Sequence, residues 1–428
     1  MIKIFLSDFE EKIKDIHNKT SFFNRPEEQR VRDIVKDVKE NGNRALLKYI
    51  KEFEYPASIF LDLVVTSTEL ELAYSRIDQE ILGILKRAIK NIRAYHEQFM
   101  DKSWSISISN NSSLGMRVSS LERVGVYVPG GTASYPSTVL MNVIPAQVAG
   151  VEQIVMATPA GKDGKVNDLV LAAAKELGIT EIYRMGGAQA IAALAFGTED
   201  LDPVDKIVGP GNIFVTLAKK EVFGVTGIDK LAGPSDICIV GDSLSNPRYI
   251  AADMLAQAEH DPLASAIFIT DSNDLANKVR QEIEKQCYPL LRKDIINQSI
   301  ANNSAIFVVQ ERDYQKIIEL INLIAPEHLE VFHEAYKTIV QGVKNAGAIF
   351  VGEYSPEVLG DYNLGPNHVL PTGGTARFSS VLSAKDFLKA SSLIFLDKKD
   401  FRDVGYDAYK LAELEGLDGH ANAARIRL

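Results

Sequence analysis

The sequence predicts an α/β protein with two Rossmann-like, doubly wound domains and small helical segments at both ends. A chain of 428 residues is too long for one ordinary core. Short apolar runs alternate with helical patterns over residues 124–240, and a second alternating series covers residues 246–351. Such alternation is typical of parallel sheets built from βαβ units. The Gly-x-Gly-x-x-Gly fingerprint is absent, so both domains are expected to be incomplete versions of the dinucleotide-binding fold.

We expect five segments along the chain. Residues 1–24 should form a helical arm, and residues 382–428 should form a helical tail. The body between them divides into two large α/β domains. One is made of two parts, residues 25–123 and 241–381, and the other consists of residues 124–240.

The stretch before the first alternating series is mostly helical. Apolar residues recur at helical spacing across residues 26–53 and 67–100. Residues 104–119 instead alternate apolar and polar side chains around Asn110 and Asn111, which is typical of a β-hairpin. The two alternating series then predict strands at residues 124–128, 153–157, 181–184, 205–208, 236–240, 265–270, 305–309, 329–332 and 347–351.

The composition disfavours nucleic-acid and membrane partners. The net charge is −10, whereas binding to nucleic acid or to an anionic membrane needs a basic face. No apolar run approaches the roughly 20 residues of a membrane span, and the N-terminus is too acidic for a transit peptide and lacks the apolar core of a signal peptide. Cys238 and Cys287 lack the spacing of a disulfide framework or a thiolate zinc site. We therefore expect a cytoplasmic protein.

Three glycine-rich turns follow expected strands. They are Pro129-Gly-Gly131, Gly186-Gly187 and Gly209-Pro-Gly211. Each lies between a strand and a helix, where backbone N–H groups and a helix N-terminus can face an anion. The turns indicate either a nucleotide site at the carboxyl ends of the strands or the tight connections of any α/β fold.

Two short motifs place an imidazole beside another polar group. Gln257 and His260 are three residues apart, which puts both side chains on one helix face near the helix end. Glu327 and His328 lie between a helix and a strand, where a carboxylate and an imidazole can move protons and activate water. The alternatives are a capped helix end and an exposed loop pair. The nearby His333 is expected at the surface.

Two later segments complete the set. Residues 360–374 are rich in glycine and proline, contain Asp361 and His368, and form a loop too long to be a mere connection. Glu415 and His420 lie near the C-terminus, where segments fray unless they are docked. Glutamine is an uncommon zinc ligand, but one group of side chains fits zinc or a similar divalent ion: Gln257, His260, Asp361 and His420.

Together these motifs resemble those of the histidinol dehydrogenase family, from about Pro26 to the C-terminus. So many long motifs in the same order make a chance match untenable. The motifs that carry the resemblance are Arg123-Val-Gly-Val-Tyr-Val-Pro-Gly-Gly131, Tyr135-Pro-Ser-Thr-Val-Leu-Met141, Gly186-Gly-Ala-Gln-Ala-Ile-Ala-Ala-Leu-Ala-Phe-Gly-Thr198, Lys206-Ile-Val-Gly-Pro-Gly-Asn212, Ala232-Gly-Pro-Ser235, Gln257-Ala-Glu-His260, Pro326-Glu-His-Leu329, the 360–372 loop, and Glu415 with His420.

The resemblance implies oxidation of L-histidinol to L-histidinal and then to L-histidine, the last two steps of histidine biosynthesis, with reduction of two NAD⁺. It implies one Zn²⁺ per subunit and an NAD-binding domain at residues 124–240. It also implies a homodimer in which the tail carrying Glu415 and His420 completes the partner's site. Within the resemblance, His328 takes the alcohol proton as hydride leaves to NAD⁺, and Glu327 activates the water that attacks the aldehyde.

The family's site residues carry over position by position. The zinc ligands implied are Gln257, His260, Asp361 and His420. The NAD contacts implied are Tyr127, Gln189 and Asn212. The substrate contacts implied are Ser235, Gln257, His260, Glu327, His328, Asp361, His368, Glu415 and His420.

Other functions remain open at this point. The nearest is a relative on the same scaffold that oxidises another small alcohol, such as a sulfonated diol; Glu327, His328 and Glu415 argue against it, because they suit a double oxidation of an amino alcohol. A zinc hydrolase would not need the glycine-rich turns, and a silent binding protein would not need the His and Glu set. Two departures from the family pattern are Lys230 and Asp418-Gly419.

Overall fold

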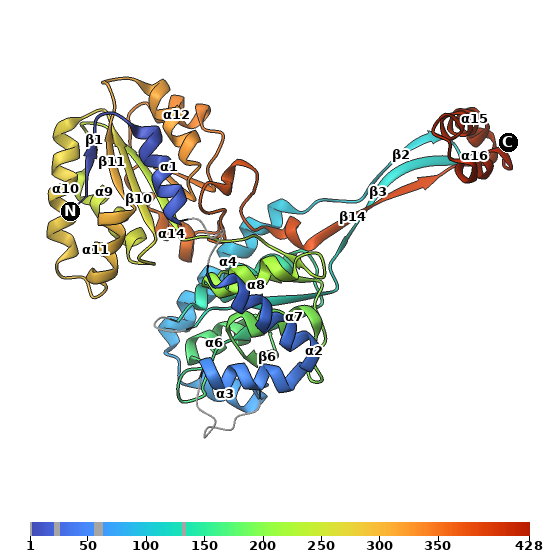
Figure 1. The fold of residues 1–428 in the computed structure, drawn as a ribbon, viewed down its shortest axis with the longest axis horizontal. Coiled ribbons are helices and arrows are strands. Elements are labelled where there is room, and N and C mark those ends of the chain that lie inside the picture. The colour runs from blue at the N-terminus through green and yellow to red at the C-terminus, as the bar shows by residue number, and fades with distance from the viewer. Residues whose placement is uncertain (1, 21–25, 55–62, 131–133) are drawn as a thin grey trace.

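The computed structural model describes residues 2–20, 26–54, 63–130 and 134–428. Two parallel sheets and their helices form the body, and a long antiparallel arm projects from it with the C-terminus at its far end (Figure 1). No helix within the described ranges is long and apolar enough to cross a membrane. Residue 1 and residues 21–24 of the expected helical arm lie outside the described residues.

The five-stranded sheet has the strand order β6-β5-β4-β7-β8. Relative to chain order within the sheet this is 3-2-1-4-5, the order of a Rossmann-type fold, and all pairings are parallel. The chain reverses direction across the sheet between β4 and β7, which is where such folds bind ligands. The strands are β4 (Arg123–Tyr127), β5 (Gln153–Thr158), β6 (Glu181–Arg184), β7 (Lys206–Val208) and β8 (Gly227–Ile228). The helices between them are α5 (Pro136–Val148), α6 (Asp168–Glu176), α7 (Gly187–Phe196) and α8 (Ile213–Val222).

The six-stranded sheet repeats the arrangement. Its order is β1-β11-β10-β9-β12-β13, so the last five strands again follow 3-2-1-4-5, and β1 adds a parallel edge strand. The strands are β1 (Ile4–Phe5), β9 (Asp236–Gly241), β10 (Ser265–Thr270), β11 (Ala305–Val308), β12 (His328–Val331) and β13 (Ala348–Val351). The helices include α9 (Pro247–Ala258), α10 (Asn273–Cys287), α11 (Lys293–Asn302), α12 (Tyr314–Ile324), α13 (Tyr336–Gly342) and α14 (Glu357–Tyr362). The prediction of two incomplete doubly wound units is confirmed.

The expected pairing of residues 25–123 with residues 241–381 is wrong. Helix α2 (Glu28–Phe53) packs on α7 and α8, α3 (Ser67–Ser75) packs on α6, and α4 (Gln79–His96) packs on α5. These helices therefore lie outside the helices that cover the two faces of the five-stranded sheet and belong to the same unit. Their periodicity shows that one face is buried, but it carries no information about which sheet buries it.

The N-terminal segment is not a separate helical arm. Its strand β1 pairs with β11, and helix α1 (Phe9–Thr20) packs on α12, so both belong to the six-stranded sheet. A two-residue strand is too short to produce a periodic pattern, which is why the sequence predicts only the helix.

The projecting arm joins residues from the middle and the end of the chain. The expected hairpin is confirmed as β2 (Trp104–Ser109) and β3 (Ser112–Ser120), and β3 also pairs with β14 (Leu388–Phe395). Helices α15 (Lys398–Leu414) and α16 (Asp418–Arg425) cap its far end (Figure 1). The expectation of an entirely helical tail missed β14, because nearly all its side chains are exposed and no alternation marks the strand.

A substitution in α4 tests this packing. Ile92 is fully buried on the side of α4 that packs on α5, so Ile92→Ala should lower the free energy of unfolding by about 2–5 kcal/mol through the cavity it leaves. Ile84 lies on the outer side of the same helix at 45% exposure, and Ile84→Ala should cost less than about 1 kcal/mol. Chemical denaturation of both variants measures the difference, and equal losses would contradict the packing of α4.

Candidate functional site

The Glu327–His328 pair lies at the amino edge of the six-stranded sheet. His328 begins β12 and pairs in register with Ile237 of β9, and Glu327 directly precedes it. Residues 229–235 connect the end of β8 to the start of β9. Because a linker of this length spans at most about 25 Å, the carboxyl edge of the five-stranded sheet and the amino edge of the six-stranded sheet border the same region.

Asp236 holds Glu327 in place through a reciprocal pair of hydrogen bonds. The Asp236 N–H donates to Glu327 Oε2 at 3.0 Å, and the Glu327 N–H donates to Asp236 Oδ1 at 2.8 Å. The second oxygen of Asp236 accepts the N–H of Gly373 at 2.9 Å. One carboxylate therefore joins β9, the start of β12 and the loop after α14. This fixes Glu327 in a buried position.

Burial and neighbouring charges set the protonation of the pair. Burial raises the pKa of Glu327 to about 8, and the imidazole of His328 opposes that rise. Burial alone would lower the pKa of His328, but the carboxylates of Glu327, Asp361 and Glu357 raise that pKa well above its ordinary value. The ring nitrogens lie 3.6–4.0 Å from these carboxylates. Such a cluster suits groups that accept and release protons near neutral pH.

The two imidazoles at 328 and 368 are oriented in the same way. His368 Nδ1 lies 3.0 Å from the carbonyl oxygen of Asp361, and His328 Nδ1 lies 3.2 Å from that of Asp236. A carbonyl only accepts, so each Nδ1 carries the proton. Each Nε2 is buried without a hydrogen-bond partner among the described residues, but that of His328 lies 3.6 Å from Asp361 Oδ1, so the Nε2 of His368 is the more available of the two to a ligand.

Gln257 and His260 lie at the end of α9, as expected. Gln257 is fully buried, and neither polar atom of its amide has a partner among the residues that the structure describes. Leaving such groups unpaired costs about 1–3 kcal/mol each, so this amide is arranged for a ligand. His260 follows one turn later, is exposed, and interacts electrostatically with Asp361. An amide oxygen, an imidazole and a carboxylate fit a divalent metal ion.

The four expected metal ligands do not lie together within one chain. No group of three or more His, Cys, Asp or Glu side chains within residues 2–20, 26–54, 63–130 and 134–428 is arranged to hold a metal ion. Of the four expected ligands, one is a glutamine, and His420 lies on α16 at the far end of the arm, away from α14 (Figure 1). Glu415 ends the neighbouring helix, and both side chains are exposed.

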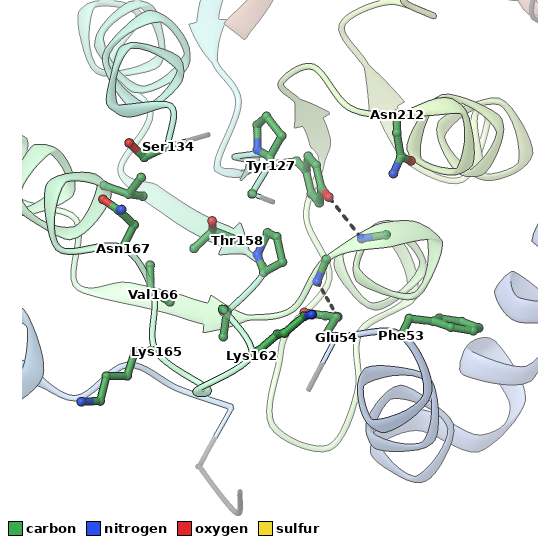
Figure 2. A pocket seen from close by; sticks show the side chains of 18 of the residues that line it. Phe53, Glu54, Tyr127, Ser134, Thr158, Lys162, Lys165, Val166, Asn167 and Asn212 are labelled. Atoms are coloured by element: carbon green, nitrogen blue, oxygen red, sulfur yellow. Dashed lines mark hydrogen bonds between the residues drawn. The ribbon is translucent and has the colours of Figure 1, made fainter. Parts of the chain in front are cut away.

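The glycine-rich turns border a large cavity at the carboxyl edge of the five-stranded sheet. Its volume is about 1300 Å³, and its lining includes the three expected NAD contacts together with residues of two turns (Figure 2). Those contacts are Tyr127, Gln189 and Asn212. Gly130 of the first turn is among the lining residues, whereas Gly131 lies outside the described residues. The cavity occupies the place where this strand order reverses, as a nucleotide site requires.

Each of the three side chains is held by a specific contact. The Tyr127 hydroxyl accepts the N–H of Gly187 at 3.1 Å, and burial raises the pKa of this phenol, which keeps it neutral. Gln189 Nε2 donates to Glu54 at 3.0 Å. Asn212 caps α8 by accepting the N–H groups of its first turn at 3.1 and 3.2 Å.

The third glycine-rich turn, Gly209-Pro-Gly211, is fixed by a close backbone approach and by a buried ion pair. Gly209 has φ +114°, and a Cβ there would lie 2.0 Å from the carbonyl oxygen of Tyr127, so only glycine fits. Its N–H donates to Asp229, whose other oxygen pairs with the buried Lys219 at 2.6 Å. This ion pair connects the turn to the start of the linker.

Several contacts were not foreseen from the sequence. Asp236 directly follows the expected Ser235, and Glu357 precedes Asp361 by one helical turn, so both had a positional signal; Glu54 had none. Ser235 itself is half-buried in the linker. The departure at Lys230 is explained, because its Nζ donates to the carbonyl oxygens of Val369 and Ser380, at 2.8 Å each.

The expectation for His333 was wrong. This side chain is buried at the carboxyl end of β12, where its ring lies 3.6 Å from Asp242 and 3.8 Å from Asp271. Its Nδ1 accepts the N–H of Ala335 at 3.0 Å. A polar neighbourhood in the sequence suggested a surface loop, whereas these partners are distant in sequence and compensate for burial.

Comparisons with known proteins identify the family of this chain. The family model described as histidinol dehydrogenase matches residues 18–428. The chain is similar to the histidinol dehydrogenase of Bacillus subtilis (strain 168), with 51% identity over 404 residues, 94% of this chain and 93% of that one. It is 50% identical to the Clostridium acetobutylicum histidinol dehydrogenase over 93% of this chain and 91% of that one. The crystal structure of histidinol dehydrogenase from Elizabethkingia anophelis matches with TM-score 0.92 and 33% identity, covering 100% of this chain and 98% of that one.

The substitution Asp236→Asn tests the hydrogen bonds by which Asp236 holds Glu327. An amide can accept only at its oxygen, so its NH₂ would face one of the two backbone N–H groups that Asp236 now accepts. We expect a loss of about 1–3 kcal/mol in unfolding free energy. The same change at the exposed Asp202 should cost less than about 0.5 kcal/mol. Denaturant titration compares the stability of the two variants. An unchanged unfolding midpoint for Asp236→Asn would show that these hydrogen bonds do not stabilise the fold.

Proposed function

This chain belongs to the histidinol dehydrogenase family, and on that premise we propose that it oxidises L-histidinol to L-histidine through L-histidinal, with reduction of two NAD⁺. The observation that carries the proposal is the placement of the buried Glu327–His328 pair at one end of a linker whose other end is bonded to the third glycine-rich turn of the five-stranded sheet. A dehydrogenase needs a proton acceptor next to the carbon that loses hydride. The two sheet edges bring these parts to one region.

The cavity is the proposed NAD⁺ site. Tyr127, Gln189 and Asn212 line it at the strand-order reversal, and the turns offer backbone N–H groups to an anionic cofactor. NAD⁺ bound there supplies the hydride acceptor for both oxidations. The missing Gly-x-Gly-x-x-Gly fingerprint is compatible with a cofactor that must be exchanged between the two steps.

The proposed zinc ligands are Gln257, His260, Asp361 and the partner subunit's His420. The unpaired buried amide of Gln257 and the neighbouring carboxylate fit a metal ion, as argued above. Zn²⁺ bound there would act as a Lewis acid and an anchor for the substrate's imidazole and amine. Its positive charge beside Asp361 would also lower the pKa of His328, because it offsets the carboxylate that favours the protonated imidazole. A proton acceptor must be neutral, so this change suits the proposed role of His328.

We assign the proton transfers of the reaction to individual residues of the chain. His328 accepts the proton of the alcohol while the carbon-bound hydrogen leaves as hydride. Glu327, held by Asp236, takes a proton from the water that adds to the aldehyde, while His328 returns its proton to the carbonyl oxygen. His328 is then neutral again and accepts a proton of the resulting hydrate in the second oxidation. Ser235 and His368 are proposed substrate contacts, and Glu415 of the partner subunit matches the substrate's ammonium group by charge. The buried position limits loss of the aldehyde to solvent.

We propose a homodimer in which each arm completes the other subunit's site. Apolar side chains are exposed along the arm, with Trp104 at 53%, Ile394 at 68% and Leu414 at 84% exposure. Exposed apolar surface of this extent is typical of an interface. We further propose cytoplasmic action without a nucleic-acid or membrane partner, in keeping with the net charge of −10.

Product stoichiometry tests the reaction. With L-histidinol as limiting substrate and excess NAD⁺, we expect about two NADH per substrate, because both oxidations take place before release. Chelation should abolish turnover and added Zn²⁺ should restore it. NADH absorbance at the end point provides the measurement. One NADH per substrate would contradict the double oxidation and support a single alcohol oxidation.

Subunit mixing tests the shared site. Glu327→Ala and His420→Ala chains should each be inactive alone, but a mixed dimer regains one intact site from the Glu327 of one chain and the His420 of the other. Random reassortment should restore about a quarter of wild-type activity. Mixing Glu327→Ala with His328→Ala is the control and should restore none, because both lesions fall in the chain's own half of the site. Equal results for the two mixtures would contradict a partner-supplied His420.

A further inference from the structure

Glu54 reaches from the end of α2 into the cavity at the five-stranded sheet. Its Oε1 accepts the N–H of Gly186 at 2.9 Å and the side-chain amide of Gln189 at 3.0 Å (Figure 2). Its Oε2 is buried and has no hydrogen-bond partner among the described residues. One oxygen therefore fixes the carboxylate while the other remains available to a donor in the cavity.

The position of Glu54 within the fold is informative. In the standard dinucleotide fold an acidic residue about 20 residues beyond the glycine fingerprint, after the second strand, accepts the 2′-hydroxyl of the adenosine ribose. Here the second strand is β5, and the residues at its end are Thr158-Pro-Ala-Gly161, which carry no carboxylate. Gly186 packs directly on Pro159, since a Cβ on Gly186 would lie 2.7 Å from the Cβ of Pro159. The carboxylate bound to Gly186 is thus next to the end of β5.

We propose that Glu54 replaces this missing acid, accepting a ribose hydroxyl of NAD⁺ and excluding the 2′-phosphate of NADP⁺ by its negative charge. The inference rests on the proposed use of NAD⁺. It assigns cofactor selectivity to a residue contributed by a helix outside the alternating βα series.

The surroundings of Glu54 support a role in selectivity. Burial raises the pKa of Glu54 to about 7, and the N–H of Gly186 and the amide of Gln189 partly offset that rise. A poorly solvated carboxylate resists a second anion beside it more strongly than an exposed one. Lys162 and Lys165 follow β5 and line the same cavity. Once the charge of Glu54 is removed, these lysines are placed to attract a phosphate group.

Asp163 is the competing candidate. It also lines the cavity and also follows β5, but it is exposed, and its carboxylate accepts the N–H of Lys165 at 3.2 Å within its own turn. A carboxylate occupied by its own turn is less available to a ribose than the buried, unpaired Oε2 of Glu54. Asp163→Asn therefore provides a matched comparison.

Equilibrium binding without turnover tests the proposal. NADH and NADPH fluorescence titrations would be compared for the full-length wild type, Glu54→Gln, Glu54→Asp, Asp163→Asn and the exposed control Glu52→Gln. Loss of a hydrogen bond to a charged acceptor should weaken NADH binding by Glu54→Gln about tenfold. NADPH binding should tighten, so the preference for NADH falls by about 100-fold. Glu54→Asp keeps the charge and should still reject NADPH, whereas Asp163→Asn and Glu52→Gln should behave as wild type.

Three outcomes would overturn the proposal. Equal weakening of NADH and NADPH by Glu54→Gln would make Glu54 a helix cap without a role in selectivity, and thermal denaturation of each variant would show the accompanying loss of stability. A change of preference in Asp163→Asn instead would identify Asp163 as the ribose acceptor. A wild type that binds neither dinucleotide would remove the proposed NAD⁺ site itself, which is distinguishable from a failure confined to Glu54.

Discussion

The linker at residues 229–235 determines how the two sheets can act together. Ligands of parallel sheets usually bind at the carboxyl ends of the strands, yet Glu327 and His328 lie at an amino edge. The linker resolves this, because it leaves the carboxyl edge of one sheet and enters the amino edge of the next. Its first residue accepts the N–H of Gly209 in the glycine-rich turn and pairs with Lys219, and its second donates to Val369 and Ser380. The third glycine-rich turn and the Glu327–His328 pair are thereby held at the two ends of one short segment.

Asp236 continues this arrangement where the linker ends. It clasps Glu327 by two hydrogen bonds and Gly373 by a third, so the linker, β12 and the loop after α14 meet at one buried carboxylate. Gly233 also donates to the hydroxyl of Thr372. The loop that follows Asp361 is therefore attached both to the linker and to the six-stranded sheet. Movement of one sheet relative to the other would strain these contacts, so the position of Glu327 and His328 depends on how the two sheets are held together.

Sequence patterns predicted local secondary structure and turns well. They predicted poorly which segments, distant in the sequence, pack against one another. The alternation of strands and helices, the hairpin around Asn110 and the glycine-rich turns are all local patterns, and the structure contains them. The placement of α2 to α4 on the five-stranded sheet was missed, since an amphipathic face does not identify what covers it. The motifs at 257–260, 327–328 and 360–374 each had an ordinary alternative until the fold brought them to one region. Glu54 was invisible to sequence reasoning because its partner, Gly186, is more than a hundred residues away.

The arm has a geometry that suits the proposed contribution of one chain to the site of another. Strand β14 pairs with β3 over its whole length, so the arm is built to hold a fixed direction away from the body. The end of the arm carries Glu415 and His420, two of the expected site residues. If these side chains only faced solvent, a fixed position would have no function for them. In the proposed dimer the same rigidity delivers His420 beside Asp361 at a defined position, as metal binding demands. The exposed apolar residues of the arm then become interface contacts, and the unpaired amide of Gln257 acquires its ligand only when two chains have met.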